Sequence, residues 1–231
     1  MKKMGDCLRL CLLLSFVGLW TACADDDYHY PSVSLEFMTA STNSNGYLQT
    51  VQADDGTVYE VMNAVAAPHL AADSTLRIVA NYAREPLDDG STGALLYEAQ
   101  TAISPVPCAP DAFAEGVKAD PASVLSIWMG LDYLNLVLEI QCADGAHAFH
   151  FVEERIDDLA PGRREVSLSL YHDAGDDPAY YTRRVYLSVP LRQYAADGGS
   201  STIRFSLRNY AGETETYTFD YSPALSLNNP L

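Results

Sequence analysis

Hydrophobic and polar residues alternate along most of the chain with the period of two that is typical of half-buried β-strands. In one clear example, Ile203, Phe205 and Leu207 alternate with polar residues. This pattern, with the turn signals between its runs, predicts strands near residues 33–40, 47–53, 57–62, 76–83, 94–102, 124–129, 133–142, 147–153, 166–172, 181–189, 202–208 and 215–221. Only residues 111–119 favour a short helical turn. The predicted fold class is therefore all-β.

A cluster of prolines divides these strands into two groups. Pro105, Pro107 and Pro110 interrupt strand pairing, because proline lacks the backbone N–H that a ladder needs. The five strands predicted before the cluster suit a small five-stranded barrel, and the seven after it suit a β-sandwich. We therefore expect a barrel domain at 32–106 and a sandwich domain at 107–231.

The first residues have the pattern of a bacterial lipoprotein signal. A basic start precedes an apolar run at residues 10–19, and the small residues Thr21 and Ala22 come directly before Cys23. The apolar run is too short to span a bilayer, which needs roughly 20 apolar residues. The prediction is a signal peptide at 1–22 and a lipid on Cys23. The alternative is an ordinary secretory signal in which Cys23 is incidental.

An acidic stretch, Asp25, Asp26 and Asp27, follows the predicted lipid site. Its placement resembles the sorting signal by which Bacteroidetes-type bacteria send lipoproteins to the cell surface. The alternative is a solvated leader that only keeps the following residues in water. We expect residues 23–31 to form an acidic, lipid-anchored tether at the outer membrane, with the protein facing the cell exterior.

The chain is strongly acidic, which restricts its partners. Removal of residues 1–22 takes away three basic residues and one acidic residue, so the formal charge changes from −17 to −19. Binding to nucleic acid needs a cluster of basic residues on the protein surface. Electrostatic binding of the protein to an anionic membrane needs one as well. We therefore expect no nucleic-acid partner, membrane attachment through the lipid alone, and an unidentified protein or glycan as the partner.

Two cysteines lie outside the leader, Cys108 and Cys142. In an oxidising envelope they are a candidate disulfide. The alternative is that Cys142, which shares the apolar parity of Leu138 and Ile140, is a buried thiol without a partner in reach.

Motifs for catalysis, cofactors or metals are missing from the sequence. It has no Gly-x-Ser-x-Gly, no phosphate-binding loop and no His-Glu-x-x-His. His147 and His150 resemble a ligand pair, but three residues apart on a strand they point to opposite faces. We predict no enzyme activity, no catalytic residue, no cofactor and no metal.

Two groups of carboxylates are candidate sites. Asp173, Asp176 and Asp177 could hold calcium, although a hairpin connection explains them better. A second group, interpreted as solvated loop charge rather than as a glycosidase pair, consists of Glu153, Glu154, Asp157 and Asp158.

Aromatic residues are the last candidate for binding, since stacked rings can bind sugars or peptides. Trp128 is expected in the core, and tyrosine is also a common strand residue. The candidates are Tyr28, Tyr30, Tyr47, Tyr82, Tyr97, Trp128, Tyr133, Tyr180, Tyr181 and Tyr186.

Two groups of short motifs carry a family resemblance. The first group is Tyr30-Pro31-Ser32-Val33, Glu36-Phe37, Thr39-Ala40, Leu48, Asp54-Asp55-Gly56-Thr57 and Tyr59-Glu60-Val61. The second group is Tyr133-Leu134-Asn135-Leu136, His150-Phe151, Tyr171-His172-Asp173-Ala174-Gly175-Asp176 and Arg183-Arg184-Val185-Tyr186-Leu187. Together they resemble the NigD-like lipoproteins over nearly all of the chain that follows the leader.

The resemblance implies an OB-like barrel followed by a β-sandwich, which agrees with the strand count. It implies no catalytic activity, and it associates the chain with bacteriocin immunity or export. We therefore expect a non-enzymatic lipoprotein of the cell envelope that acts as a binding module. The alternative function is a glycan-binding accessory lipoprotein.

Overall fold

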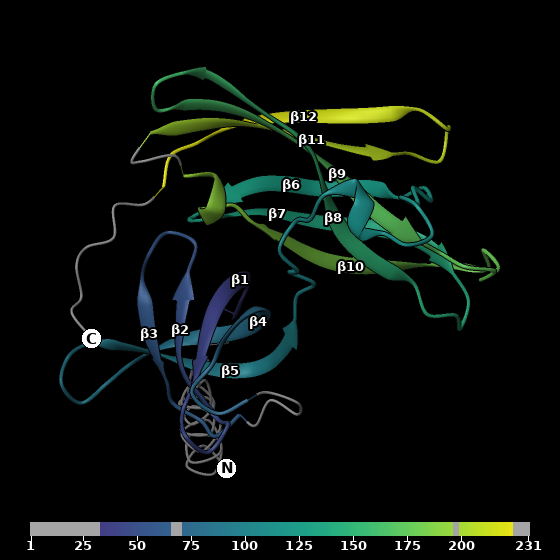
Figure 1. The fold of residues 1–231 in the computed structure, drawn as a ribbon. Helices are drawn as coiled ribbons and strands as arrows, with labels where there is room; N and C mark the ends of the chain where they lie inside the picture. The colour runs from purple at the N-terminus through teal and green to yellow at the C-terminus, as the bar shows by residue number, and fades with distance from the viewer. Residues whose placement is uncertain (1–32, 66–70, 196–198, 224–231) are drawn as a thin grey trace, which may run out of the picture. The chain divides into compact units, whose positions relative to one another are not determined.

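The computed structural model describes residues 33–65, 71–195 and 199–223. The predicted signal peptide at 1–22, the lipid site Cys23 and the sorting signal at Asp25, Asp26 and Asp27 lie outside these residues. Within the described ranges, no helix has the length and apolar character needed to cross a membrane. The described residues form an all-β fold, as predicted (Figure 1).

The first five strands close into a barrel. They are β1 (Val33–Thr42), β2 (Leu48–Ala53), β3 (Val58–Val61), β4 (Thr75–Pro86) and β5 (Thr92–Thr101). Their order is β1-β2-β3-β5-β4, and β1 pairs with β4 to complete the closure. Alternate residues such as Met38, Val51 and Ile78 point inward and fill the barrel. The predicted five-stranded OB-like barrel is confirmed.

The next seven strands form a sandwich of two sheets. They are β6 (Ser123–Gly130), β7 (Tyr133–Cys142), β8 (Ala148–Ala160), β9 (Arg163–Asp173), β10 (Tyr181–Pro190), β11 (Ser200–Arg208) and β12 (Thr214–Tyr221). One sheet has the order β10-β7-β6 and the other has the order β12-β11-β9-β8. This arrangement confirms the predicted seven-stranded sandwich.

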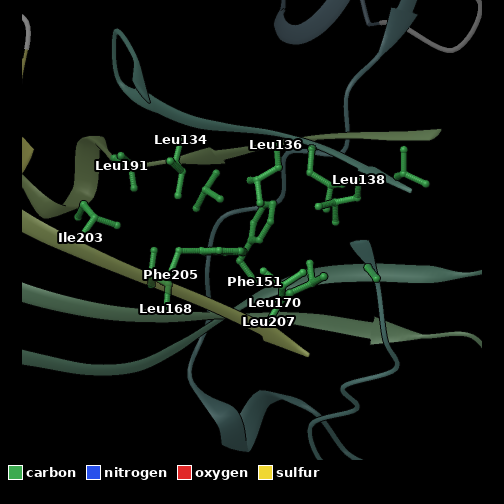
Figure 2. Close-up of a cluster of buried hydrophobic side chains, with 14 of the residues drawn as sticks. Leu134, Leu136, Leu138, Phe151, Leu168, Leu170, Leu191, Ile203, Phe205 and Leu207 are labelled. Atoms are coloured by element: carbon green, nitrogen blue, oxygen red, sulfur yellow. The ribbon is translucent and has the colours of Figure 1, made fainter. Parts of the chain in front are cut away.

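The sandwich core forms where the inner faces of the two sheets meet. Figure 2 shows Leu134, Leu136 and Leu138 of β7 on one side, facing Phe205 and neighbouring side chains of the other sheet. The rings of Phe151 and Phe205 meet edge to face at 6.3 Å between centroids. The period-two residues of the sequence are therefore the residues that fill this core.

Two local predictions need correction. The strand expected at 147–153 continues to Ala160, so Glu153, Glu154, Asp157 and Asp158 lie in β8 and not in a loop. Pairing with β9 sustains this part of β8 although both of its faces are largely exposed to solvent. The helical turn expected at 111–119 is limited to a short 3-10 helix, Pro110–Ala112.

The barrel also has an apolar patch on its outer surface, packed against the three-stranded sheet. Phe37, Val79 and Ala102 are buried there, in contact with Trp128 and Tyr186 among others. The Phe37 ring meets the Trp128 ring edge to face at 5.4 Å. Trp128 is therefore partly buried at the joint between the domains.

Candidate functional site

Arg77 of β4 is the centre of a buried polar network at the joint. Its side chain is only 2% exposed, and it donates to Asp54 at 2.5 Å in an ion pair. It also donates to Asn135 Oδ1 at 3.0 Å and to Ser188 Oγ at 3.0 Å, both in the sandwich. The guanidinium lies 4.2 Å from the centre of the Tyr133 ring. A buried charge is stable only when paired and hydrogen-bonded, and Arg77 meets both conditions.

The partners of Arg77 also bind one another. Asn135 Nδ2 donates to the second oxygen of Asp54 at 2.6 Å, and Ser188 Oγ donates to Asn135 Oδ1 at 2.7 Å. Asp54 belongs to the turn after β2, so one barrel carboxylate is held by both domains. The network therefore fixes the barrel and the sandwich as one body.

The sequence analysis does not predict this network, because Asp54 stands there only as part of a short motif that follows a predicted strand. One signal was present in β4. Inward residues Leu76, Ile78 and Ala80 alternate there with Arg77 and Val79, and Val79 is an apolar residue on the side expected to face water. An apolar residue on the outer parity indicates a second buried face.

A second buried polar chain lies at one end of the sandwich. His147 Nδ1 lies 2.8 Å from His172 Nε2, and His147 Nε2 lies 3.1 Å from Asp177 Oδ2. His172 Nδ1 lies 3.0 Å from the Asp120 carbonyl oxygen. Since a carbonyl oxygen only accepts, His172 Nδ1 is a donor. These contacts connect the turn before β8 with the connection from β9 to β10.

The surroundings of these hydrogen-bonded side chains shift the pKa values of His172 and Asp177. Burial is the main cause that lowers the pKa of His172, while its bond to the Asp120 carbonyl acts in the opposite direction. Burial alone would raise the pKa of Asp177, but the N–H groups of Ala143 and Gly145, together with His147, outweigh it and lower that pKa. Asp177 is therefore held as a carboxylate that ties the two connections together.

His147 and His150 do not form a ligand pair, as their spacing predicts. His147 belongs to the buried chain, whereas the His150 ring meets the Phe113 ring edge to face at 5.5 Å. Among the described residues there is no group of three or more His, Cys, Asp or Glu side chains that could hold a metal ion.

The aspartates that are candidate calcium ligands act separately. Asp173 pairs with Lys118 at 2.7 Å and accepts the Gly175 N–H, whereas Asp177 accepts the N–H groups of Ala143 and Gly145. These bonds are typical of carboxylates that shape a strand connection.

The two cysteines are free thiols on different sheets. Cys108 pairs with the edge of β8, whereas Cys142 ends β7 and is buried. The candidate disulfide is thus absent from the structure, because each cysteine is held by the backbone of a different sheet. Burial, with Asp111 and Glu153 nearby, raises the pKa of the Cys108 thiol, so it lacks the activation of a nucleophile.

The carboxylates of β8 are also engaged one by one. Glu153 accepts the Tyr194 hydroxyl at 2.8 Å, Glu154 accepts the Ser169 hydroxyl at 2.6 Å, and Asp158 pairs with Arg164 at 2.7 Å. None of these contacts joins two carboxylates in the arrangement that a glycosidase uses.

An open cavity of about 240 Å³ lies beside the edge of β10, and we call it the β10 groove. Residues from three regions of the chain line it, including Gln100, Thr101, His147, Phe149, Arg183 and Arg184. Both arginines are exposed. The groove therefore presents two guanidinium groups on a protein whose overall charge is strongly negative.

Three exposed tyrosines gather around the end of β7. Tyr180 is 79% exposed and its N–H donates to the Cys142 carbonyl. The Tyr181 hydroxyl donates to the Ala143 carbonyl, and the Tyr210 hydroxyl accepts the Gln141 N–H at 2.6 Å. These bonds hold two of the rings in place at the surface. Tyr82, another aromatic candidate, is buried in the barrel.

Comparisons with known proteins agree on one family. The family model of the NigD-like C-terminal beta sandwich domain matches residues 104–221. Among solved structures, a NigD-like immunity protein from Bacteroides caccae is 33% identical. The match covers 85% of this chain and 100% of that chain, with a TM-score of 0.69.

Two more distant structures share the fold alone. A protein of unknown function from Bacteroides vulgatus is 18% identical, with 86% of this chain and 95% of that chain covered and a TM-score of 0.62. A candidate lipoprotein from Bacteroides fragilis is 14% identical, with 85% and 100% covered and a TM-score of 0.56. Among curated proteins, none matches. The domain match and the Bacteroides caccae relative show that this chain belongs to the NigD-like family.

Proposed function

We propose that this chain is a non-enzymatic lipoprotein of the cell envelope that binds a protein partner in bacteriocin immunity. The observation that carries the proposal is its 33% identity with the NigD-like immunity protein from Bacteroides caccae over the whole of that chain. Immunity needs specific binding rather than catalysis. A related role in bacteriocin export would use the same binding capacity.

The geometry is suited to binding. The Arg77 network joins two domains into one body, so surfaces on both domains keep a fixed relation when a partner docks. Preorganised surfaces lose less conformational entropy on association. The β10 groove is a concave and charged surface of such a body.

The location is part of the same proposal. We infer that Cys23 carries lipid, that the acidic tether leads from it, and that the protein faces the exterior from the outer membrane. The Bacteroides fragilis candidate lipoprotein, which shares the fold, supports an anchored form. An immunity protein at the outer face would meet a bacteriocin before it reaches the membrane.

The test is deletion of the gene from its host, followed by growth under culture supernatants of bacteriocin-producing strains from the same community. Deletion should widen the zones of inhibition for at least one supernatant, and a plasmid copy should restore the original size. A copy carrying Cys23→Ser should fail to restore it. Unchanged inhibition by every supernatant would refute the immunity role.

A second candidate function, glycan binding, is favoured by the tyrosines at the end of β7. Tyr180, Tyr181 and Tyr210 present aromatic surface of the kind that stacks on sugar rings. Titration with host and bacterial oligosaccharides, with a Tyr180→Ala and Tyr181→Ala variant as control, tests it. Binding that the double variant loses would favour this function over immunity.

A further inference from the structure

β10 is an edge strand with an open side. Its partner β7 lies on one side only, and the other side receives Ile103. The Ile103 N–H donates to the Tyr186 carbonyl at 3.0 Å, and the Ser188 N–H donates to the Ile103 carbonyl at 2.9 Å. Backbone groups of even-numbered residues in β10 therefore point away from β7.

The same parity applies further along the strand, at Thr182 and Arg184. Their backbone N–H and C=O groups face the open side, where the described part of the chain offers no backbone partner. An edge with unpaired N–H and C=O groups can accept another extended chain as an added strand. This stretch of the edge borders the β10 groove.

The two arginines of the groove also lack ionic partners. Within the described ranges, neither Arg183 nor Arg184 has a carboxylate within ion-pair distance, although Glu139 is opposite Arg184 in the strand register. By contrast, Arg77 and Arg164 each pair with an aspartate. In a chain with 31 acidic and 14 basic residues, Arg183 and Arg184 place two uncompensated positive charges side by side.

Consecutive residues of a strand point to opposite faces of the sheet. Arg183 shares the parity of Val185, which contacts the sandwich core, and Arg184 shares the parity of Tyr186, which contacts the barrel. An added strand alternates in the same way. Two consecutive acidic residues in it would therefore meet one arginine on each face.

We propose that the open edge of β10 binds an extended, acidic peptide segment of the protein partner, paired to Thr182 and Arg184 by backbone hydrogen bonds and to the Arg183 and Arg184 guanidiniums by two consecutive carboxylates. The inference rests on the proposed function, because it names the chemistry of the segment that is bound. Charge complementarity selects the occupant. The strand edge favours a peptide over an anionic glycan, since a glycan cannot complete a β-ladder.

The test selects peptides from a random octapeptide display library on the purified full-length chain in detergent, at low ionic strength. Selected peptides should share two consecutive acidic residues, and binding should weaken as salt is added. The double variant Arg183→Gln/Arg184→Gln should weaken binding at least about tenfold, as expected for the loss of two charge-assisted contacts. The matched control Arg163→Gln/Arg204→Gln, which removes the same charge elsewhere, should bind like the parent.

A backbone variant separates strand addition from simple charge attraction. Thr182→Pro removes an N–H that points away from β7, so it leaves the existing ladder intact and should still weaken peptide binding, whereas Thr182→Ala should not. Hydrogen exchange should show that bound peptide protects the amides of Thr182 and Arg184. Thermal melts of each variant establish that it is folded.

Several results would overturn the proposal. The proposal is wrong if the selected peptides lack consecutive acidic residues, or if the Arg183→Gln/Arg184→Gln variant binds them as tightly as the parent. It is also wrong if bound peptide leaves the amides of Thr182 and Arg184 unprotected from hydrogen exchange. Binding of a heparin tetrasaccharide in place of any peptide would assign the groove to an anionic glycan. Failure here is distinguishable from failure of the immunity role, because gene deletion would still change bacteriocin sensitivity if only the peptide site were wrong.

Discussion

The carboxylate of Asp54, in the barrel, occupies the space where a side chain on Gly130, in the sandwich, would begin. A Cβ atom added to Gly130 would lie 2.2 Å from Asp54 Oδ2 and 2.7 Å from Asn135 Nδ2. Both distances are far below van der Waals contact. The last residue of β6 must therefore be glycine for Asp54 to reach Arg77.

The first prediction concerns this close approach. Gly130→Ala should displace Asp54 and lower the free energy of unfolding by about 1–3 kcal/mol, the range for overpacked interiors. Urea unfolding would measure it. In an Asp54→Ala background the same change should cost less, because the clash with the carboxylate is gone and only the clash with Asn135 remains. Equal costs in the two backgrounds would contradict the contact.

The second prediction concerns Arg77. Arg77→Met removes the counter-charge of Asp54 and should lower the free energy of unfolding by about 3–5 kcal/mol, because a largely buried carboxylate then keeps its hydrogen bond from Asn135 but has no opposite charge beside it. The double variant Arg77→Met/Asp54→Asn should recover part of this loss. Urea unfolding of the two variants and the parent measures the difference. An Arg77→Met protein as stable as the parent would show that the network does not stabilise the joint.

The third prediction concerns acidic pH. Because burial lowers the pKa of His172, the unfolded chain binds more protons at this ring than the folded protein does as the pH falls below about 6.5. The stability contributed by the neutral ring is thus complete above that pH and is lost below it.

Urea midpoints at pH 8, 7, 6 and 5 should therefore decline toward the lowest pH. The decline should be shallower in His172→Gln, although that variant starts from a lower stability. His150→Gln, a control at a ring outside the buried chain, should follow the parent curve. Parallel curves for the parent and His172→Gln would rule out this histidine as the source.

The fourth prediction concerns the lipid. Cys23→Ser should move the protein from the membrane fraction to the soluble fraction and abolish labelling by radioactive palmitate, because anchoring requires acyl chains on that thiol. Cys108→Ser is the matched control and should stay in the membrane fraction. A Cys23→Ser protein that is still labelled would show that the lipid is elsewhere.

The fifth prediction concerns orientation. Protease added to intact cells should digest the parent protein, while a variant with Asp25, Asp26 and Asp27 replaced by alanine should be protected. Immunoblotting for the domains that follow the tether gives the readout, and a periplasmic protein serves as the control for intact cells. Protection of both forms would place the protein inside the outer membrane and reduce the aspartates to a solvated tether.

Much of the fold could be predicted because its strands bury one face. In β7 and β11, inward residues such as Leu136 and Phe205 alternate with outward ones, and that period is visible in the sequence. The second half of β8 could not be predicted in this way. Its residues Glu153 to Ala160 bury almost nothing, and the strand exists there through backbone bonds to β9, which leave no pattern in the side chains.

The candidate site was hidden for a different reason. Arg77, Asn135 and Ser188 come from three distant stretches, and each looks like an ordinary outward strand residue. They become a buried network only through the contact between the domains. The alternation of apolar and polar residues within one strand does not reveal that contact. For Arg183 and Arg184, the sequence reveals the pair but not the open edge beside it, because edge strands are defined only by the sheet order.

The joint between the two domains has a consequence for how such chains evolve. Separation near residue 106 would expose Phe37 and Val79 to water and leave Arg77 without its acceptors in the sandwich. A sandwich transferred by recombination to another protein would carry Asn135 and Ser188 without the Arg77 and Asp54 side chains that they bind in the barrel. Barrel and sandwich should therefore be inherited together, and change in the family should concentrate on edges and connections that the joint does not use.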